Sequence, residues 1–170
     1  MQPIIQHYPY RLLAGFSFFG NPFHSNAGWT EENEIGRLWK RLLAFWALPN
    51  CPYPLPTISY EVHLQNHETP RTGEFEVFVG FEVQAFNSVP VELCVKILPE
   101  ADYAIFTLRG EQIRSDEPII DRWLASAGYQ MAFSFFIQRY DQRFKGLDRL
   151  DESELDFLIA VRRTNSDDCT

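Results

Sequence analysis

The predicted structural elements of this chain occur twice in the same order. Apolar residues at helical spacing predict one helix within residues 30–47 and another within residues 116–128. In each half a strand comes before the helix and two strands follow it. Both halves carry an Ile and a Trp four residues apart on the helix and a glycine at the end of the preceding strand: Ile35, Trp39 and Gly20, then Ile119, Trp123 and Gly110. A strand–helix unit of this kind cannot bury its apolar face alone. We therefore predict two duplicated strand–helix–strand–strand modules that share one sheet.

β-branched and aromatic runs separated by polar or proline-containing breaks predict the strands. They occupy residues 7–23, 57–66, 74–86, 91–99, 102–110, 131–144 and 154–163. Connections of hairpin length make the sheet mainly antiparallel. We predict an α+β fold in which a curved sheet carries two helices, with a central ligand cavity at the seam between the halves. Residues 1–162 are expected to form a single domain, and residues 163–170 a disordered tail.

The helix ends have recognisable signals. Thr30 is predicted to cap the first helix and Pro49 to end it, and the second helix is expected to start near Asp116 and to end at Gly128. The apolar stripe of each helix faces the sheet.

Composition and charge exclude several classes of function. The net charge is −8 and the pI is near 5.0, so the surface disfavours direct binding of nucleic acid and of anionic membranes. The three cysteines are widely spaced, and no glycine-rich phosphate loop or nucleophile motif is present, so we predict no cofactor. His63 lies on a predicted strand and His67, four residues further on, lies in the turn that follows it, so the two do not share a face as metal ligands would. With no signal-peptide layout and no apolar run long enough to span a bilayer, we expect a cytoplasmic protein.

The strand around residues 133–140 is apolar on both faces. Alternate residues point to opposite sides, so Gln138 shares a face with Phe136 and Tyr140, while Phe135 and Ile137 share the other. The helices cover only one face of a sheet. We therefore expect a homodimer or a fused partner to cover the face around Phe135 and Ile137.

Several short motifs, in this order and spacing, resemble the GyrI-like family. They are Leu38–Trp39 in the first helix, the Tyr-Glu-Val at residues 60–62, the Gly-Phe-Glu-Val at residues 80–83, the segment 102–110 and the segment 138–144. The resemblance covers about residues 8–162. The family comprises effector-binding domains of bacterial MerR- and AraC-type regulators and free-standing gyrase-inhibitory proteins. Its duplicated fold is the one predicted above from the order of elements.

The resemblance implies an aromatic-lined pocket that contains buried acid and binds lipophilic, often cationic, compounds. Each aromatic face attracts a desolvated cation by about 0.5–2 kcal/mol. Carried over position by position, the resemblance assigns to the pocket wall the residues Trp39, Tyr60, Phe78 and Tyr140, with Phe106 as a fifth.

The chain departs from the family at the centre of the penultimate strand. The family pattern resembles Glu-x-Tyr-Asp, with the Glu as the main acid of the pocket, and this chain has Gln138 there. A hydrogen bond to an uncharged amide contributes less than one to a charged group, so we expect a preference for neutral or weakly basic ligands. A second acidic position of the family matches Asp156. Without the resemblance, Gln138 reads more simply as a hydrogen-bonded core amide.

We predict a free-standing, non-catalytic protein that binds lipophilic, aromatic or weakly cationic small molecules and that has no DNA-binding segment of its own. Two alternatives stay open. One is a protein-interaction module that inhibits or escorts a larger enzyme, as gyrase-inhibitory relatives do. The other is a hydrolase of strained electrophiles, with Asp156 or Glu82 as its base because Gln138 cannot take a proton.

Overall fold

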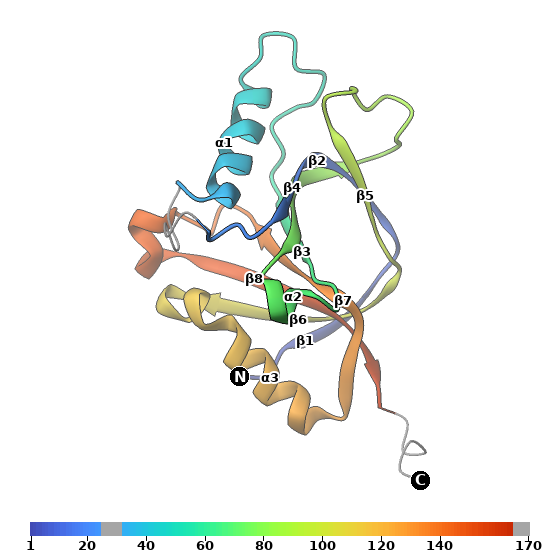
Figure 1. Cartoon of the computed structure of the whole chain (residues 1–170), viewed down its shortest axis with the longest axis vertical. Helices are drawn as coiled ribbons and strands as arrows, with labels where there is room; N and C mark the ends of the chain where they lie inside the picture. Colours follow the sequence, from blue (N-terminus) through green and yellow to red (C-terminus); the bar gives the residue numbers. More distant parts are fainter. Residues whose placement is uncertain (25–31, 165–170) are drawn as a thin grey trace.

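The computed structural model describes residues 1–24 and 32–164. Its strands, with bounds, are β1 (Ile4–Tyr8), β2 (Arg11–Gly20), β3 (Ser59–Leu64), β4 (Phe75–Val83), β5 (Cys94–Leu98), β6 (Ala101–Arg109), β7 (Tyr129–Tyr140) and β8 (Glu154–Arg163). Its helices are α1 (Glu34–Trp46), α2 (Thr69–Thr72) and α3 (Asp116–Ala127), with the 3-10 segments η1 (Gly110–Ser115) and η2 (Leu147–Glu152). Figure 1 shows α1 and α3 at opposite ends of the long axis, with the sheet between them.

The duplication predicted from the sequence is confirmed. The order β2–α1–β3–β4 in the first half recurs as β6–α3–β7–β8 in the second, and each unit is preceded by a further short strand, β1 or β5. The eight strands form one antiparallel sheet in the order β1-β6-β8-β7-β3-β4-β2-β5. The halves meet where β3 pairs with β7, and each short strand extends the sheet of the other half.

The predicted strand over residues 7–23 proved to be two strands. Pro9 and Tyr10 separate β1 from β2; because Pro has no backbone N–H to donate, it interrupts the pairing. The break lets β1 pair with β6 at one end of the sheet while β2 pairs with β4 and β5 at the other. The polar connection predicted between β3 and β4 contains the short helix α2.

Helix α1 starts later than predicted. The side chain of Asn33 accepts a hydrogen bond from the N–H of Gly36 at 2.8 Å and so caps the helix, whereas Thr30 lies outside the described residues. Helix α3 ends as predicted: Gly128 follows it with φ of 69°, a left-handed conformation that glycine adopts without strain. None of the helices in the described part of the chain is long and apolar enough to span a membrane.

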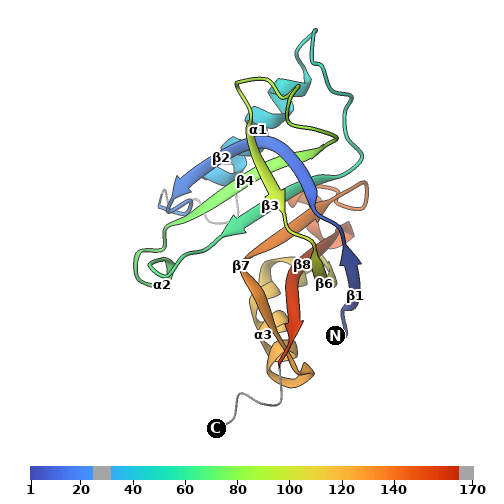
Figure 2. The same cartoon turned by 90° about the vertical axis from the view of Figure 1, so that its right-hand side faces the viewer.

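The sheet curls so that its inner face encloses a core contributed by all eight strands (Figure 2). Phe135 and Ile137 belong to this core and are 9% and 0% exposed. Strands of the other half cover them, with Leu13 of β2 and Phe78 of β4 in the same cluster. The reason given above for a homodimer was therefore wrong: the second apolar face of β7 is buried by the chain's own curved sheet.

Two features accompany the curvature. Gly15 of β2 pairs with Gly80 of β4, and a Cβ on Gly15 would lie 2.0 Å from the carbonyl oxygen of Val79, so the backbones approach too closely for any side chain there. Near the ends of the sheet, the guanidinium of Arg11 lies 4.5 Å from the ring centre of Tyr8 and 5.3 Å from that of Tyr103. This contact ties β2 to β1 and β6 across the inner face.

On the outer face each helix covers its own half. Helix α1 packs on β2 and β4 through Leu38, Leu42 and Phe45, and α3 packs on β6 and β8 through Ile120 and Trp123. The two clusters are separate, and the β3–β7 seam runs between them. The side chains of β3 and β7 that point outward at this seam are therefore available to form a site.

Candidate ligand-binding site

A cavity of about 900 Å³ lies over the outer face of the β3–β7 seam, beside α1. Drug-sized ligands occupy cavities of about 300–1,000 Å³. Helix α1, the segment before β3, the outward residues of β3 and β7, and the segment after β7 form its walls. Its lining includes Gly36, Trp39, Lys40, Leu43, Trp46, Ser59, Glu61, His63, Gln138, Tyr140, Asp141, Arg143 and Phe144.

Aromatic rings form one wall of the cavity. Trp39 of α1 meets Tyr140 of β7 edge to face, with ring centres 4.7 Å apart, and Tyr140 meets Phe144 in the same way at 4.9 Å. Trp46 and Leu43, one to two turns further along α1, continue this wall. Edge-to-face contacts of this kind hold the rings in fixed orientations, so the wall presents ordered apolar surface to a ligand.

The floor of the cavity is polar although it is buried. Ser59, Glu61 and His63 alternate with apolar residues along β3, so all three point to the outer face. Glu61 is 3% exposed and lies directly across the ladder from Gln138, which is also 3% exposed. The seam therefore places a carboxylate and an amide side by side at the centre of the sheet.

The Glu61 carboxylate is hydrogen-bonded to side chains of three elements, α1, β3 and β7. The indole Nε1 of Trp39 donates to its Oε2 at 2.7 Å, and its Oε1 lies 2.6 Å from Nε2 of His63. The hydroxyl of Tyr140 donates to Oε1 of Gln138 at 2.7 Å and lies 3.4 Å from Glu61 Oε2. Burial, with the charge of Glu61 adding to it, raises the pKa of the Tyr140 phenol well above its usual value. Tyr140 therefore stays protonated and acts as a donor.

The structure places three of the seven predicted site residues, Trp39, Gln138 and Tyr140, around this cavity. Trp39 forms part of the aromatic wall and donates a hydrogen bond to Glu61. Gln138 lies in the floor, and Tyr140 contacts the ring of Trp39 and donates to the amide of Gln138. This position agrees with the predicted seam between the halves, although the cavity opens on the helix-bearing face of the sheet.

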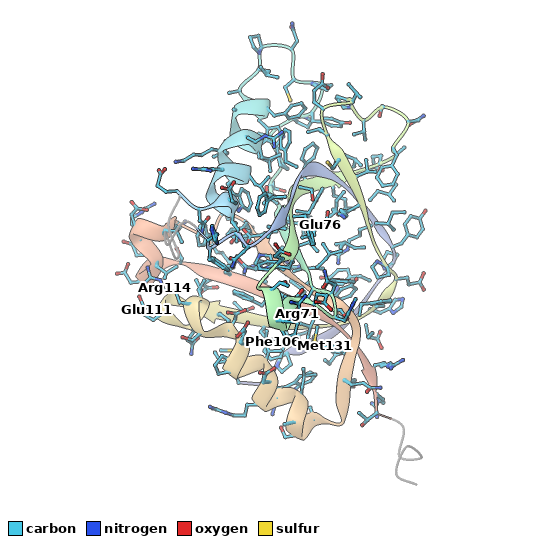
Figure 3. The ribbon with its side chains drawn as sticks, in the orientation of Figure 1. Arg71, Glu76, Phe106, Glu111, Arg114 and Met131 are labelled. Carbon is cyan, nitrogen blue, oxygen red and sulfur yellow. The ribbon has the colours of Figure 1, made fainter. Side chains whose placement is uncertain are left out.

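Three other aromatic residues assigned to the pocket by resemblance lie elsewhere. Tyr60 and Phe78 belong to the inner core, on the opposite face of the sheet, because Tyr60 alternates with Glu61 along β3. Phe106, labelled in Figure 3, is fully buried on β6 and packs edge to face against Trp123 of α3 at 5.5 Å. None of the three lines the cavity, and each fills a core.

Asp156 also lies outside the cavity. It is 1% exposed, and its carboxylate is held by the guanidinium of Arg139 at 2.7 Å, by that of Arg143 at 2.5 Å and by the hydroxyl of Thr107 at 2.6 Å. Burial raises the pKa of Asp156, but the hydrogen bonds from Arg143, Thr107 and Arg139 outweigh it and hold that pKa below its usual value. Asp156 therefore anchors Arg143, which lines the cavity.

Glu61 and His63 were not among the site residues predicted from the sequence. The signal was present: the Ser-Tyr-Glu-Val-His-Leu of β3 alternates polar and apolar residues, which is typical of a strand with one polar face. That face is buried rather than exposed to water, which the alternation alone does not reveal. In the described residues, no group of three or more His, Cys, Asp or Glu side chains is placed to bind a metal.

The sequence matches an effector-binding family and a curated transcriptional regulator. Residues 5–161 match the family described as integron-associated effector binding protein, Cass2. The chain is 29% identical over 153 residues to the transcriptional regulator BrlR of Pseudomonas aeruginosa, a match that covers 88% of this chain and 51% of BrlR. The chain thus spans about half the length of this curated relative.

Solved structures share the fold at low sequence identity. The structure of SAV2435 bound to tetraphenylphosphonium has a TM-score of 0.66 and 12% identity and covers 95% of this chain and 94% of its own. A hydrolase from Listeria innocua has a TM-score of 0.56 and 9% identity and covers 95% of this chain and 92% of its own. At these identities the likeness shows the fold alone.

Proposed function

The chain belongs to the Cass2 family of integron-associated effector-binding proteins, and on that premise we propose that it binds lipophilic aromatic molecules, including cations, in the cavity beside α1. The observation that carries the proposal is the buried carboxylate of Glu61 in the floor of a cavity walled by Trp39 and Tyr140. A buried charge is costly unless it is paired. A cavity that holds a buried carboxylate among aromatic rings is suited to a ligand of opposite charge.

The positions of Glu61 and Gln138 refine the ligand class. The family pattern resembles an acid at position 138, and here the acid stands across the ladder on β3 while position 138 carries an amide. The two side chains together offer a charged acceptor for a cation and an amide for a neutral polar group. We propose that the site accepts both lipophilic cations and neutral aromatics of similar size. In a structural neighbour the bound molecule is tetraphenylphosphonium, a lipophilic cation.

We propose binding rather than catalysis at this site. The two bases considered for hydrolysis are both unsuited: Asp156 is engaged by Arg139 and Arg143 outside the cavity, and Glu82 is exposed on β4 and does not line it. The Glu61 carboxylate is already the acceptor of two short hydrogen bonds. A role as an inhibitor or escort of a larger protein stays a prediction.

The test fills the cavity without weakening the helix. Gly36 lies three, four and seven residues before Trp39, Lys40 and Leu43, on the face of α1 that lines the cavity. Gly36→Leu adds bulk there and replaces a residue that costs a helix about 1 kcal/mol. Ala44→Leu adds bulk to an exposed position of the same helix, outside the cavity lining, and is the matched control.

Calorimetric titration of both variants with tetraphenylphosphonium and with neutral triphenylphosphine oxide gives the result. We expect the native protein and Ala44→Leu to bind both probes, and Gly36→Leu to lose at least about tenfold in affinity while its Tm is unchanged or higher. Equal affinities in the native protein and Gly36→Leu would overturn the proposed location, and no binding of any aromatic probe to the native protein would overturn the function.

A further inference from the structure

We infer that His63 is a proton-coupled selectivity residue of this site: a cationic ligand binds by displacing a proton from His63, and a neutral ligand binds without doing so. The inference rests on the proposed function, because it assumes that ligands enter the cavity over Glu61. It predicts that the preference of the site between cations and neutral molecules depends on pH.

The geometry of His63 singles it out from the other histidines of the described chain. His63 is 6% exposed, and its Nε2 lies 2.6 Å from Oε1 of Glu61, which is 3% exposed. Its ring is held between Phe75 and Phe136, with ring centres 5.2 Å and 4.6 Å away. The imidazole therefore cannot turn away from the carboxylate without repacking two aromatic side chains.

Histidine is the side chain that gains and loses a proton between pH 5 and 8. When His63 is protonated, it and Glu61 form a pair with no net charge, and the floor of the cavity suits a neutral ligand. When His63 is neutral, the Glu61 charge is no longer balanced by it, and the floor attracts a cation. A proton on His63 and a cation in the cavity thus compete for one carboxylate.

Other titratable groups face this pair from the surrounding elements. Asp116, at the start of α3, interacts electrostatically with His63 and Tyr140; burial raises its pKa. Tyr140 of β7 remains protonated, as its raised pKa requires. On β4, neither Phe75, which contacts the His63 ring, nor Val77, which pairs with His63 across the ladder, carries a charge.

From α1, the group that contacts Glu61 is the uncharged indole of Trp39, and Lys40 lies further out on the same helix. Asp141 and Arg143, after β7, pair with each other at 2.7 Å. Asp116 is therefore the acid whose own titration most needs to be separated from that of His63.

Thermodynamic linkage gives the size of the effect. If binding of a cation releases n protons, its affinity rises by a factor of ten to the power n for each pH unit, and n for a single histidine is at most one. A permanently charged probe is needed so that the ligand itself does not titrate. Tetraphenylphosphonium meets this condition, and triphenylphosphine oxide is a neutral probe of similar size and shape.

The experiment measures the Kd of both probes for the native protein between about pH 5.5 and 8. We expect the Kd for tetraphenylphosphonium to fall by up to about tenfold per pH unit over part of this range, and the Kd for the oxide to stay within about threefold. In the native protein, titration calorimetry in two buffers of different ionisation enthalpy should show proton release with the cation and none with the oxide.

Three variants make the assignment. His63→Gln keeps a donor for Glu61 and does not titrate, so its cation affinity should be independent of pH; His67→Gln makes the same change at a side chain that is 89% exposed and should behave as the native protein does. Asp116→Asn should retain the pH dependence.

The outcomes separate this inference from the proposed function. Tetraphenylphosphonium binding that is tight but independent of pH in the native protein would overturn the role of His63 and leave the site intact. So would a pH dependence that survives in His63→Gln or disappears in Asp116→Asn. Failure of both probes to bind would overturn the proposed function itself.

Discussion

Replacing Glu61 by Gln removes the buried negative charge from the cavity floor while keeping the shape of the side chain. The amide oxygen of Gln can still accept the hydrogen bond that Trp39 donates at 2.7 Å in the native protein. The cost in stability should therefore be small, about 1 kcal/mol. The cost in cation binding should be larger and can be worked from the electrostatics.

Two unit charges about 6 Å apart, at an effective dielectric constant of about 20, attract each other by about 3 kcal/mol. Hydrogen bonds from Trp39 and from His63, 2.6 Å away, already offset part of the Glu61 charge, which brings the expected loss to about 1.4–3 kcal/mol. That is a loss of about 10- to 100-fold in affinity for tetraphenylphosphonium. Triphenylphosphine oxide carries no charge, and its affinity should stay within about threefold.

The assay is calorimetric titration at one fixed pH of about 8, the upper end of the range in which histidine side chains change charge. Glu82→Gln is the matched control, because Glu82 is an exposed glutamate on β4 outside the cavity lining. It changes the net charge of the protein equally but should leave both affinities unchanged. If Glu61→Gln binds the cation as tightly as the native protein does, or loses equal affinity for both probes, the electrostatic reasoning is refuted.

The remaining predictions concern stability. Asp156→Asn removes the carboxylate that holds Arg139 and Arg143 and should lower the free energy of unfolding by about 2 kcal/mol, measured by urea denaturation; an unchanged midpoint would contradict it. Because the folded-state pKa of Asp156 is depressed, its contribution is present above the unfolded value of about 3.9 and is lost as the pH falls through the folded pKa, so acid should destabilise the native protein more than Asp156→Asn. Trp39→Phe keeps an aromatic ring but leaves Glu61 without the indole donor and should cost about 1–2 kcal/mol in the same assay, a cost that a second substitution, Glu61→Gln, should reduce.

The duplicated architecture could be predicted from the sequence because each half carries its own local signals. Trp39 and Trp123 lie on the apolar stripes of the two helices, and Gly20 and Gly110 lie where the preceding strands end, so they mark equivalent positions in the two halves. Both glycines have positive φ values, 149° and 55°, so the signal has a conformational cause. The exchange of β1 and β5 between the halves could not be predicted, because pairing of strand edges depends on how the sheet curls and not on local pattern.

The cavity was predicted in the right region, but its residues only in part. Trp39, Gln138 and Tyr140 lie around it, whereas Tyr60 points to the inner core. Hydrophobicity could not show which face of β3 lines the cavity, because β3 is buried on both faces. Tyr60 and Glu61, on opposite faces, are almost equally inaccessible to water, at 4% and 3% exposure. Only the three-dimensional curvature of the sheet determines which face of β3 meets the helices and the cavity.

A crystal structure of the protein with tetraphenylphosphonium bound tests the central claim most directly. The account predicts the cation in the cavity over the β3–β7 seam, with phenyl rings against Trp39 and Tyr140 and the phosphorus about 6 Å from the Glu61 carboxylate. A cation bound elsewhere on the protein, with the space beside α1 filled by the chain's own side chains, would contradict it.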